Sequence, residues 1–366
     1  MTLRKRRIGA ARLPALASLC AALAACGGGS GTAPASTSPQ PPAATTAIVD
    51  TVGNGGTIID TLPTDAGVDA SGNIYVADVN QQQVTRIAPD GTLTSYIAKS
   101  GATVQYALGA PGGLAVDPQG DVYVGSGDNV VEVTPSGQIS TPYQLSTVYA
   151  ALPNAYQDGR SGGQTPDQFA VDVSGNLYLT VTCSGIVRKI APSGAMTTLA
   201  SNLGIELNSF VIGGGEGSIT QCVAGANGIA VDSFGNVYAA DTLNKVILKI
   251  TSAGTVTTLA GSPGASGLAD GTGSSASFTA PGTLSVDENG NVYLIDQGLV
   301  RMISPQGVVK TLVGNSASKA AVVLPNATAP QESGAGAALA YGSNLYVFSG
   351  YTTYGWALLK FGNLLN

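Results

Sequence analysis

Short runs of alternating aliphatic and polar residues, separated by glycine turns, repeat along most of the chain. The clearest is an eight-residue phrase: Val-Asp, two variable residues, Gly, Asn or Asp, an aliphatic residue and Tyr. It occurs at 68–75, 116–123, 171–178, 231–238 and 286–293, with a degraded copy at 340–346. The tyrosines of these copies lie 48 to 60 residues apart. Alternation predicts strands, and a period of about 50 residues predicts a radial repeat.

The fourth copy shows how one repeat divides into strands. We expect strand a over 228–232, strand b over 236–240, strand c over 245–251 and strand d over 255–260. A second turn, between strands c and d, also recurs in phase and carries Gly91, Gly137, Gly194, Gly254 and Gly307. Two turn types repeating together predict blades of four antiparallel strands.

The two ends of the repeat region complement each other. The last repeat supplies 345–349 and 357–361, but no fourth strand follows them. The segment 47–53 reads like the strands d at 257–262 and 310–315. We therefore expect an all-β fold, a six-bladed β-propeller of four-stranded antiparallel blades, whose ring is closed by an N-terminal strand that completes the last blade.

The repeat resembles the NHL repeat, and blade four matches it nearly throughout. The matching positions are Asn227, Gly228, Asp232, Gly235, Asn236, Tyr238, Asp241, Asn244, Ile250 and Gly254. The resemblance covers residues 47–366 and implies a six-bladed propeller there. It says little of function, because one fold serves many functions.

The N-terminus has the features of an export signal. A basic stretch precedes the short apolar segment 13–25, which is too short to span a bilayer. Leu23-Ala24-Ala25-Cys26-Gly27 resembles the lipobox of a bacterial lipoprotein. That resemblance implies a signal peptide over 1–25, lipidation of Cys26, and an anchor in the bacterial cell envelope. By the same resemblance, Gly27 after the cysteine implies sorting of the lipoprotein to the outer membrane. Residues 26–46 lack charge and large apolar side chains and are expected to be a flexible linker before the domain at 47–366.

Charge and cysteine content limit the partners and the compartment. Five of the 16 basic residues precede the expected cleavage site, so 11 basic residues remain against 22 acidic ones. This negative field disfavours nucleic acid and leaves the lipid anchor as the contact with the membrane.

In the oxidising periplasm and cell envelope, Cys183 and Cys222 are expected to form a disulfide, with two free thiols as the alternative.

The chain contains no histidine. Propeller lyases of the streptogramin-inactivating kind depend on an active-site His, and peptide-amidating lyases hold zinc through His. Neither chemistry, nor a Ser-His-Asp or Cys-His arrangement, can be built from these residues. The enzymatic alternative that survives is a Ca²⁺-dependent, lactonase-like hydrolase at the mouth of the central channel. We expect no catalytic residue and favour a non-catalytic module.

Carboxylates near the ends of strands b are candidate ligands on the face formed by the b–c and d–a loops. They are Asp78, Asp128, Asp241 and Asp296. An incomplete ring of such oxygens suits Ca²⁺. The alternative is that each Asp caps its own loop, and this alternative needs no cofactor. The aspartates of the repeated phrase are expected to accept hydrogen bonds in the a–b turns, and its tyrosines to pack between neighbouring sheets.

The long loop 144–165 carries Tyr149, Tyr156 and Arg160 among small residues. Aromatic and Arg side chains on exposed loops are typical of binding hot spots. A surface loop without a role is the open alternative. We therefore expect a monomeric binding or scaffold propeller, tethered to the envelope, that presents its loop face to a protein, peptide or glycan.

Overall fold

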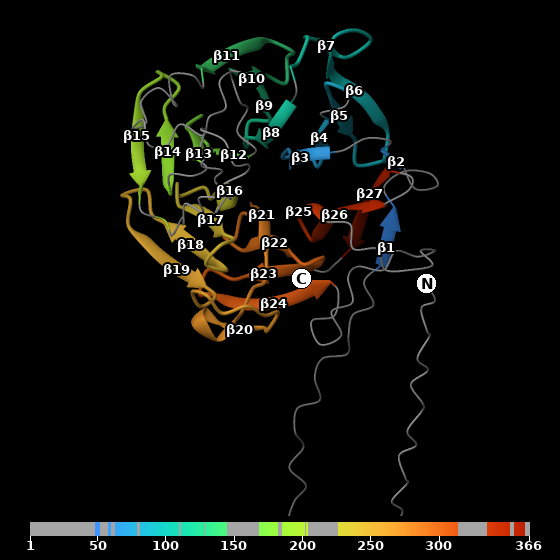
Figure 1. The fold of residues 1–366 in the computed structure, drawn as a ribbon. Coiled ribbons are helices and arrows are strands. Elements are labelled where there is room, and N and C mark those ends of the chain that lie inside the picture. Colours follow the sequence, from blue (N-terminus) through green and yellow to red (C-terminus); the bar gives the residue numbers. More distant parts are fainter. Residues whose placement is uncertain are drawn as a thin grey trace, which may run out of the picture. The chain divides into compact units, whose positions relative to one another are not determined.

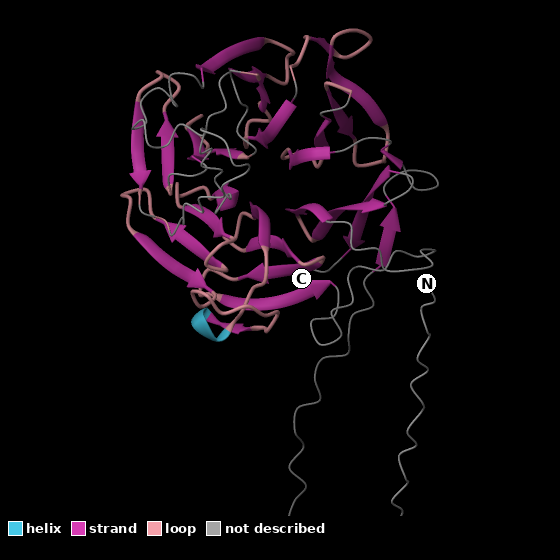
Figure 2. Cartoon of the chain, viewed as in Figure 1, coloured by secondary structure: helices cyan, strands magenta, loops and turns pink. Residues whose placement is uncertain are grey.

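A computed structural model divides the chain into two units, Met1–Ala44 and Thr45–Asn366, and all residues that it describes lie in the second. The described residues are 48–51, 58–59, 63–78, 81–109, 111–127, 129–144, 168–181, 185–201, 203, 226–313, 335–351 and 355–362. They consist of strands and turns, with one short 3-10 helix, η2 (Gly273–Ser275) (Figure 2). No helix in these ranges has the length and apolar character needed to cross a bilayer.

Five blades are each built from one continuous stretch of chain, and they stand around a ring (Figure 1). Blade 1 contains β3 (Pro63–Val68), β4 (Ile74–Asp78), β5 (Gln83–Ile87), β6 (Leu93–Ala98) and the short β7 (Val104–Gln105). Blade 2 contains β8 (Pro111–Val116), β9 (Val122–Ser126), β10 (Asn129–Val133) and β11 (Ile139–Gln144). Blade 3 contains β12 (Phe169–Val171), β13 (Leu177–Val181), β14 (Ile186–Ile190) and β15 (Met196–Ala200).

Blades 4 and 5 follow the same antiparallel order. Blade 4 contains β16 (Ala226–Val231), β17 (Val237–Asp241), β18 (Val246–Ile250) and β19 (Val256–Ala260). Blade 5 contains β21 (Pro281–Val286), β22 (Val292–Asp296), β23 (Leu299–Ile303) and β24 (Val308–Val313), with β20 (Gly271–Thr272) added at its outer edge. The expected strands of the fourth repeat agree with the observed ones to within two residues at every end. The all-β propeller of four-stranded antiparallel blades is confirmed.

A sixth sheet is composite, because it joins the two ends of the propeller sequence. Its order is β1 (Ile48–Thr51), β27 (Gly355–Gly362), β26 (Asn344–Tyr351) and β25 (Ala335–Tyr341), and β2 (Ile58–Ile59) also pairs with β27. In the antiparallel register of β1 and β27, Ile48 lies opposite Gly362 and Thr51 opposite Leu359. The predicted pairing of the first propeller strand with the last is confirmed.

Hydrophobic clusters fill the seams between neighbouring sheets. Each repeat tyrosine is buried in a cluster with residues of the next sheet: Tyr75, Tyr123, Tyr178, Tyr238, Tyr293 and Tyr346. The composite sheet takes part on both sides, since Ala338 packs with blade 5 and Leu339 with blade 1. Packing between sheets, as predicted for the tyrosines, is confirmed.

The a–b turn is held by the Asp of the repeated phrase. In blade 1, Asp69 Oδ1 accepts the backbone N–H groups of Ser71 (2.8 Å) and Asn73 (2.9 Å). Its Oδ2 accepts the hydroxyl of Tyr75 at 3.1 Å. Gly72 at the tip has φ +80°, a conformation that residues with a Cβ rarely adopt. The turn role expected for these aspartates is confirmed, and the bond to the tyrosine adds to it.

Asp65 on β3 joins blade 1 to blade 2. Its carboxylate accepts the backbone N–H groups of Ala66 and of Leu114 on β8, both at 2.9 Å. Burial raises the pKa of Asp65 to about 7, although these two hydrogen bonds lower it. The native state therefore binds a proton at Asp65 more tightly than the unfolded chain does, and its ionisation costs stability as the pH rises.

Replacing Asp65 by Asn should flatten the dependence of stability on pH. The folded pKa lies above the unfolded value of 3.8, so the wild type should lose stability between about pH 4 and pH 7. Urea unfolding at pH 5 and pH 8 should show a smaller difference for the variant. The exposed Asp90, whose pKa is lowered mainly by hydrogen bonds from Thr92, provides the control, and Asp90→Asn should leave the difference unchanged. An equal difference for the Asp65 variant and the wild type would contradict this role.

Deleting residues 47–55 should destabilise the propeller and cause aggregation. The deletion removes β1 and exposes the edge of β27, whose unpaired backbone groups can pair with another chain. Thermal melting with light scattering measures both effects. Deletion of residues 30–38, which precede the closing strand, is the control and should melt like the wild type. A soluble 47–55 deletion that melts cooperatively at the wild-type temperature would show that β1 is dispensable.

Candidate functional site

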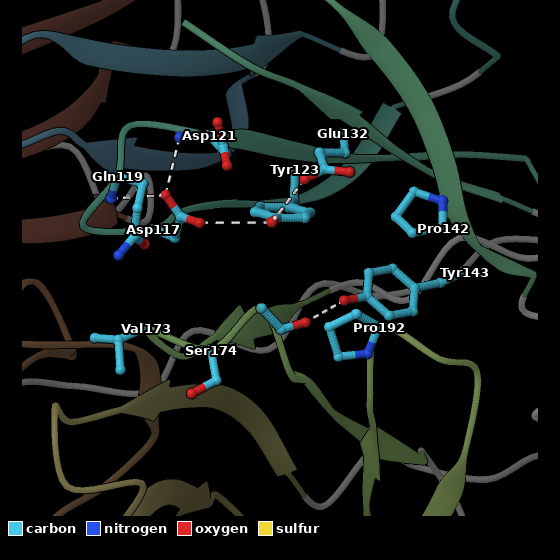
Figure 3. Close-up of a pocket in the computed structure, with 11 residues that line it drawn as sticks. Asp117, Gln119, Asp121, Tyr123, Glu132, Pro142, Tyr143, Val173, Ser174 and Pro192 are labelled. Carbon is cyan, nitrogen blue, oxygen red and sulfur yellow. Dashed lines mark hydrogen bonds between the residues drawn. The ribbon is translucent and has the colours of Figure 1, made fainter.

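A pocket of about 270 Å³ opens at the seam between blades 2 and 3, beside the a–b and c–d turns (Figure 3). One wall is the a–b turn of blade 2, and the opposite wall comes from turns of blade 3. The lining residues are Asp117, Gln119, Asp121, Tyr123, Glu132, Pro142, Tyr143, Val173, Ser174, Gly175 and Pro192. Three of these described residues are carboxylates and none is Lys or Arg, so the pocket is strongly acidic.

The first carboxylate that distinguishes blade 2 is Asp121. In four other copies of the phrase its position holds an Asn whose amide donates to the turn Asp at 2.7 to 2.9 Å: Asn73, Asn176, Asn236 and Asn291. Asp121 has no amide to donate. Its backbone N–H still bonds to Asp117 Oδ1 at 2.9 Å, so the turn forms with two carboxylates side by side.

The second distinguishing carboxylate is Glu132 on β10, which lies opposite Tyr123 in the sheet register. In the other sheets the residue opposite the repeat tyrosine is a cation or an uncharged side chain: Arg86, Lys189, Lys249, Met302 and Lys360. Blade 2 thus reverses the charge at this position. Glu132 Oε1 accepts the hydroxyl of Tyr123 at 3.1 Å, and Oε2 accepts that of Ser140.

The electrostatic consequence appears in the pKa values. Burial, followed by the charges of Asp117 and Glu132, raises the pKa of Asp121. Burial raises the pKa of Asp117 as well, and the charge of Glu132 adds to the effect. In blade 3 burial acts in the same direction, but hydrogen bonds led by the Asn176 side chain hold the pKa of Asp172 below its ordinary value. The pocket of blade 2 therefore concentrates negative charge, and its described lining contains no Lys or Arg.

Two tyrosines form the aromatic part of the pocket. The rings of Tyr123 and Tyr143 are 6.5 Å apart between centroids and inclined at 46°. The Tyr143 hydroxyl donates to the carbonyl of Gly175 across the seam and so joins the two blades (Figure 3). Burial and nearby carboxylates raise the pKa of both phenols, which therefore stay neutral. The site combines carboxylates, aromatic rings and proline side chains.

Exposed apolar side chains lie on the same side of the ring as this pocket. The large apolar residues that are exposed in the described part of the chain all lie in a–b turns or at the first residue of a fourth strand, where that strand leaves the c–d turn: Leu93, Ile139, Val173, Phe234 and Val256. Phe234 is 80% exposed, and Val173, which lines the pocket, is 44% exposed. We call this side of the ring the turn face. Val173 therefore gives the acidic pocket an exposed apolar contact.

Two aspartates predicted on the opposite, loop face are held by their own loops. Asp78 is buried at the end of β4, and its Oδ1 accepts the Gln81 N–H at 3.0 Å. Asp241 ends β17 and accepts the backbone and side-chain N–H groups of Asn244 at 2.9 and 2.8 Å. Burial raises the pKa of Asp241. These bonds match the capping alternative, and a binding role for the two residues stays a prediction.

The third aspartate, Asp296, holds a segment of its own blade. It accepts the N–H groups of Thr279 and Ala280, and its Oδ2 lies 3.5 Å from Nη1 of the fully buried Arg301. Arg301 also donates to the carbonyl of Ala269 (2.9 Å) and to Asp270 (3.1 Å). Arg301 and Asp296 together fix residues 269–280 against blade 5. In the described part of the chain no three His, Cys, Asp or Glu side chains are grouped to hold a metal ion.

The other predicted site residues lie outside the described residues. They are Cys26, Asp128, Tyr149, Tyr156, Arg160, Cys183 and Cys222. The lipid attachment, the disulfide and the binding loop therefore stay predictions.

Sequence reasoning did not single out Asp121, Glu132 or Tyr143. For Asp121 a signal existed, because the phrase at 116–123 is the one full copy with Asp in place of Asn.

Comparison with known proteins supports the fold and leaves the family open. No protein-family model matches the chain. A curated relative, Teneurin-3 of Danio rerio, is 25% identical over 272 residues, which are 63% of this chain and 10% of that protein. The chain thus spans about a tenth of the length of this relative.

Two solved structures share the fold at low identity. One is a protein of unknown function from Bacteroides thetaiotaomicron (17% identity, 86% of this chain and 75% of that one, TM-score 0.53). The other is a gluconolactonase from Xanthomonas campestris (14% identity, 83% and 87%, TM-score 0.51). Both are bacterial proteins, and these likenesses establish the β-propeller; the NHL assignment stays a prediction.

Replacing Asp121 by Asn should stabilise the protein by about 1 kcal/mol at pH 7, the usual contribution of one hydrogen bond. The variant regains the amide donor and loses one of the crowded charges. Because the folded pKa of Asp121 is raised, the wild type recovers stability as the pH falls through that pKa. The advantage of the variant should therefore shrink at pH 4. Urea unfolding at both pH values measures it.

The reciprocal change in blade 3 is the control for this prediction. Asn176→Asp installs the arrangement of blade 2 beside Asp172 and should destabilise the protein by a similar amount at pH 7. An Asp121→Asn variant that is less stable than the wild type at pH 7 would show that the crowding of carboxylates in blade 2 carries no cost.

Proposed function

We propose that this protein is a non-catalytic binding module of the bacterial cell envelope, a closed propeller whose turn face receives a protein or peptide partner. The observation that carries the proposal is the acidic, tyrosine-lined pocket between blades 2 and 3, whose lining includes the exposed Val173. The composite sheet acts as the sixth blade and makes the ring rigid, so that the face is preformed. A preformed surface loses little entropy on binding.

The envelope location rests on the N-terminal segment. Cleavage before Cys26 and lipidation of that residue would tether the propeller near the membrane, and the 20 residues 27–46 reach about 25 Å as a random coil. The bridge between Cys183 and Cys222 belongs to the same oxidising compartment. The loop residues Tyr149, Tyr156 and Arg160 would provide a second contact surface for a protein, peptide or glycan. The protein acts as a monomer.

A Ca²⁺-dependent lactonase is the second candidate. It is favoured by the buried carboxylates at the ends of β4, β17 and β22, Asp78, Asp241 and Asp296, which share one face of the ring. Against it stand the hydrogen bonds that commit each carboxylate to its own loop or segment. Hydrolysis of a sugar lactone that stops when Ca²⁺ is chelated would reverse the order of the two candidates.

Photo-crosslinking from the turn face tests the binding function. A photoreactive residue in place of Phe234 should form one prominent adduct in intact cells, which mass spectrometry identifies and which binds the purified protein. The matched control places the same residue at Thr258, an exposed position on the outer strand β19. Equal adduct yields from the two positions, or an adduct whose purified protein fails to bind, would count against the turn face as the binding surface.

A further inference from the structure

The geometry points to a specific ligand for the pocket between blades 2 and 3: a protein segment that places a Lys or Arg side chain next to an apolar one. The basic side chain occupies the pocket, and the apolar neighbour packs on Val173. This inference rests on the proposed binding function and names the chemical class of the partner.

The repeat itself shows that the ring of its tyrosine accepts a cation. In three sheets the ammonium group of the residue opposite lies over that ring, at 5.3 Å for Lys189 and Tyr178, 5.5 Å for Lys249 and Tyr238, and 5.9 Å for Lys360 and Tyr346. Such cation–π contacts strengthen when they are shielded from water. In blade 2 the residue opposite Tyr123 is Glu132, so no cation comes from that position.

The carboxylates of the pocket suit an ammonium or guanidinium group. Asp117 already accepts two turn N–H groups and lies 3.5 Å from the Tyr123 hydroxyl, while Glu132 accepts the hydroxyls of Tyr123 and Ser140. Among the described residues no three His, Cys, Asp or Glu side chains form the compact cage of ligands that a metal ion needs. An extended cation with several N–H donors can contact several carboxylates at once.

The size of the pocket and its surroundings favour a side chain of a polypeptide over a free small molecule. Pockets for drug-sized ligands are about 300–1,000 Å³, and this one, at about 270 Å³, lies below that range. The exposed Val173, which belongs to the lining, offers an apolar contact beside the carboxylates. A free amine would leave this side chain uncovered, whereas a peptide covers it.

Calorimetric titration with three probes tests the inference: acetyl-Leu-Lys-Leu-amide, its counterpart with norleucine in place of Lys, and butylammonium. The Lys peptide should bind at least tenfold more tightly than either of the others, and its affinity should fall between 50 and 500 mM NaCl. Glu132→Lys restores the cation of the other blades and should weaken the Lys peptide at least tenfold. Lys249→Met is the matched control, since Met302 occupies that position in blade 5, and should leave the affinity unchanged.

The outcomes separate the inference from the proposed function. Equal binding of the Lys and norleucine peptides would overturn the cationic ligand and leave a binding face in place. Equal binding of butylammonium and the Lys peptide would overturn the polypeptide partner in favour of a free amine. If no probe binds and the crosslink at Phe234 still yields a binding partner, the proposed ligand class is wrong. If no probe binds and the crosslink also yields no partner, the turn face is not the binding surface.

Discussion

The buried carboxylate of the Val-Asp aspartate is the interaction on which the propeller depends. Asp69, Asp117, Asp172 and Asp232 are buried, so their carboxylates must be satisfied by hydrogen bonds. Two turn N–H groups satisfy one oxygen, and the hydroxyl of the repeat tyrosine binds the other, as in Asp232 with Phe234, Asn236 and Tyr238. This bond fixes the position of the tyrosine, and the tyrosine fills the seam to the next sheet. A local turn thereby sets the spacing between each of blades 1 to 5 and the sheet that follows it.

The candidate site arises where one copy of this arrangement changes its charges but keeps its geometry. The turn of blade 2 still forms around Asp117, and Tyr123 still fills the seam. Two neighbouring residues differ. Asp121 places a carboxylate where the other blades have the amide of an Asn, and Glu132 places one where most of the other sheets have a cation. The stability of the repeat thus tolerates a local electrostatic cost, and such costs gather at functional positions.

The fold could be predicted from the sequence because its determinants are local. Val-Asp, the Gly of the turn and the Tyr stand within eight residues, and the closing strand at 48–51 carries the pattern of a fourth strand. The site was harder to predict because it depends on pairs that meet only in the sheet register, such as Tyr123 and Glu132, and on the seam with Gly175. Treating Asn and Asp as equivalent in the phrase hid Asp121. The binding surface was expected on the loop face, where several of the residues concerned lie outside the described ranges.

The composite sheet has a mechanical consequence. Residue 48 both begins the strand that closes the ring and receives the chain that comes from the N-terminal segment. A pull on that segment therefore acts first on the hydrogen bonds between β1 and β27. Because the two strands are antiparallel neighbours, a force along β1 loads these bonds in shear, all together, while a force across the sheet opens them one after another. The direction of a pull on the N-terminal segment would then decide how firmly the ring stays shut.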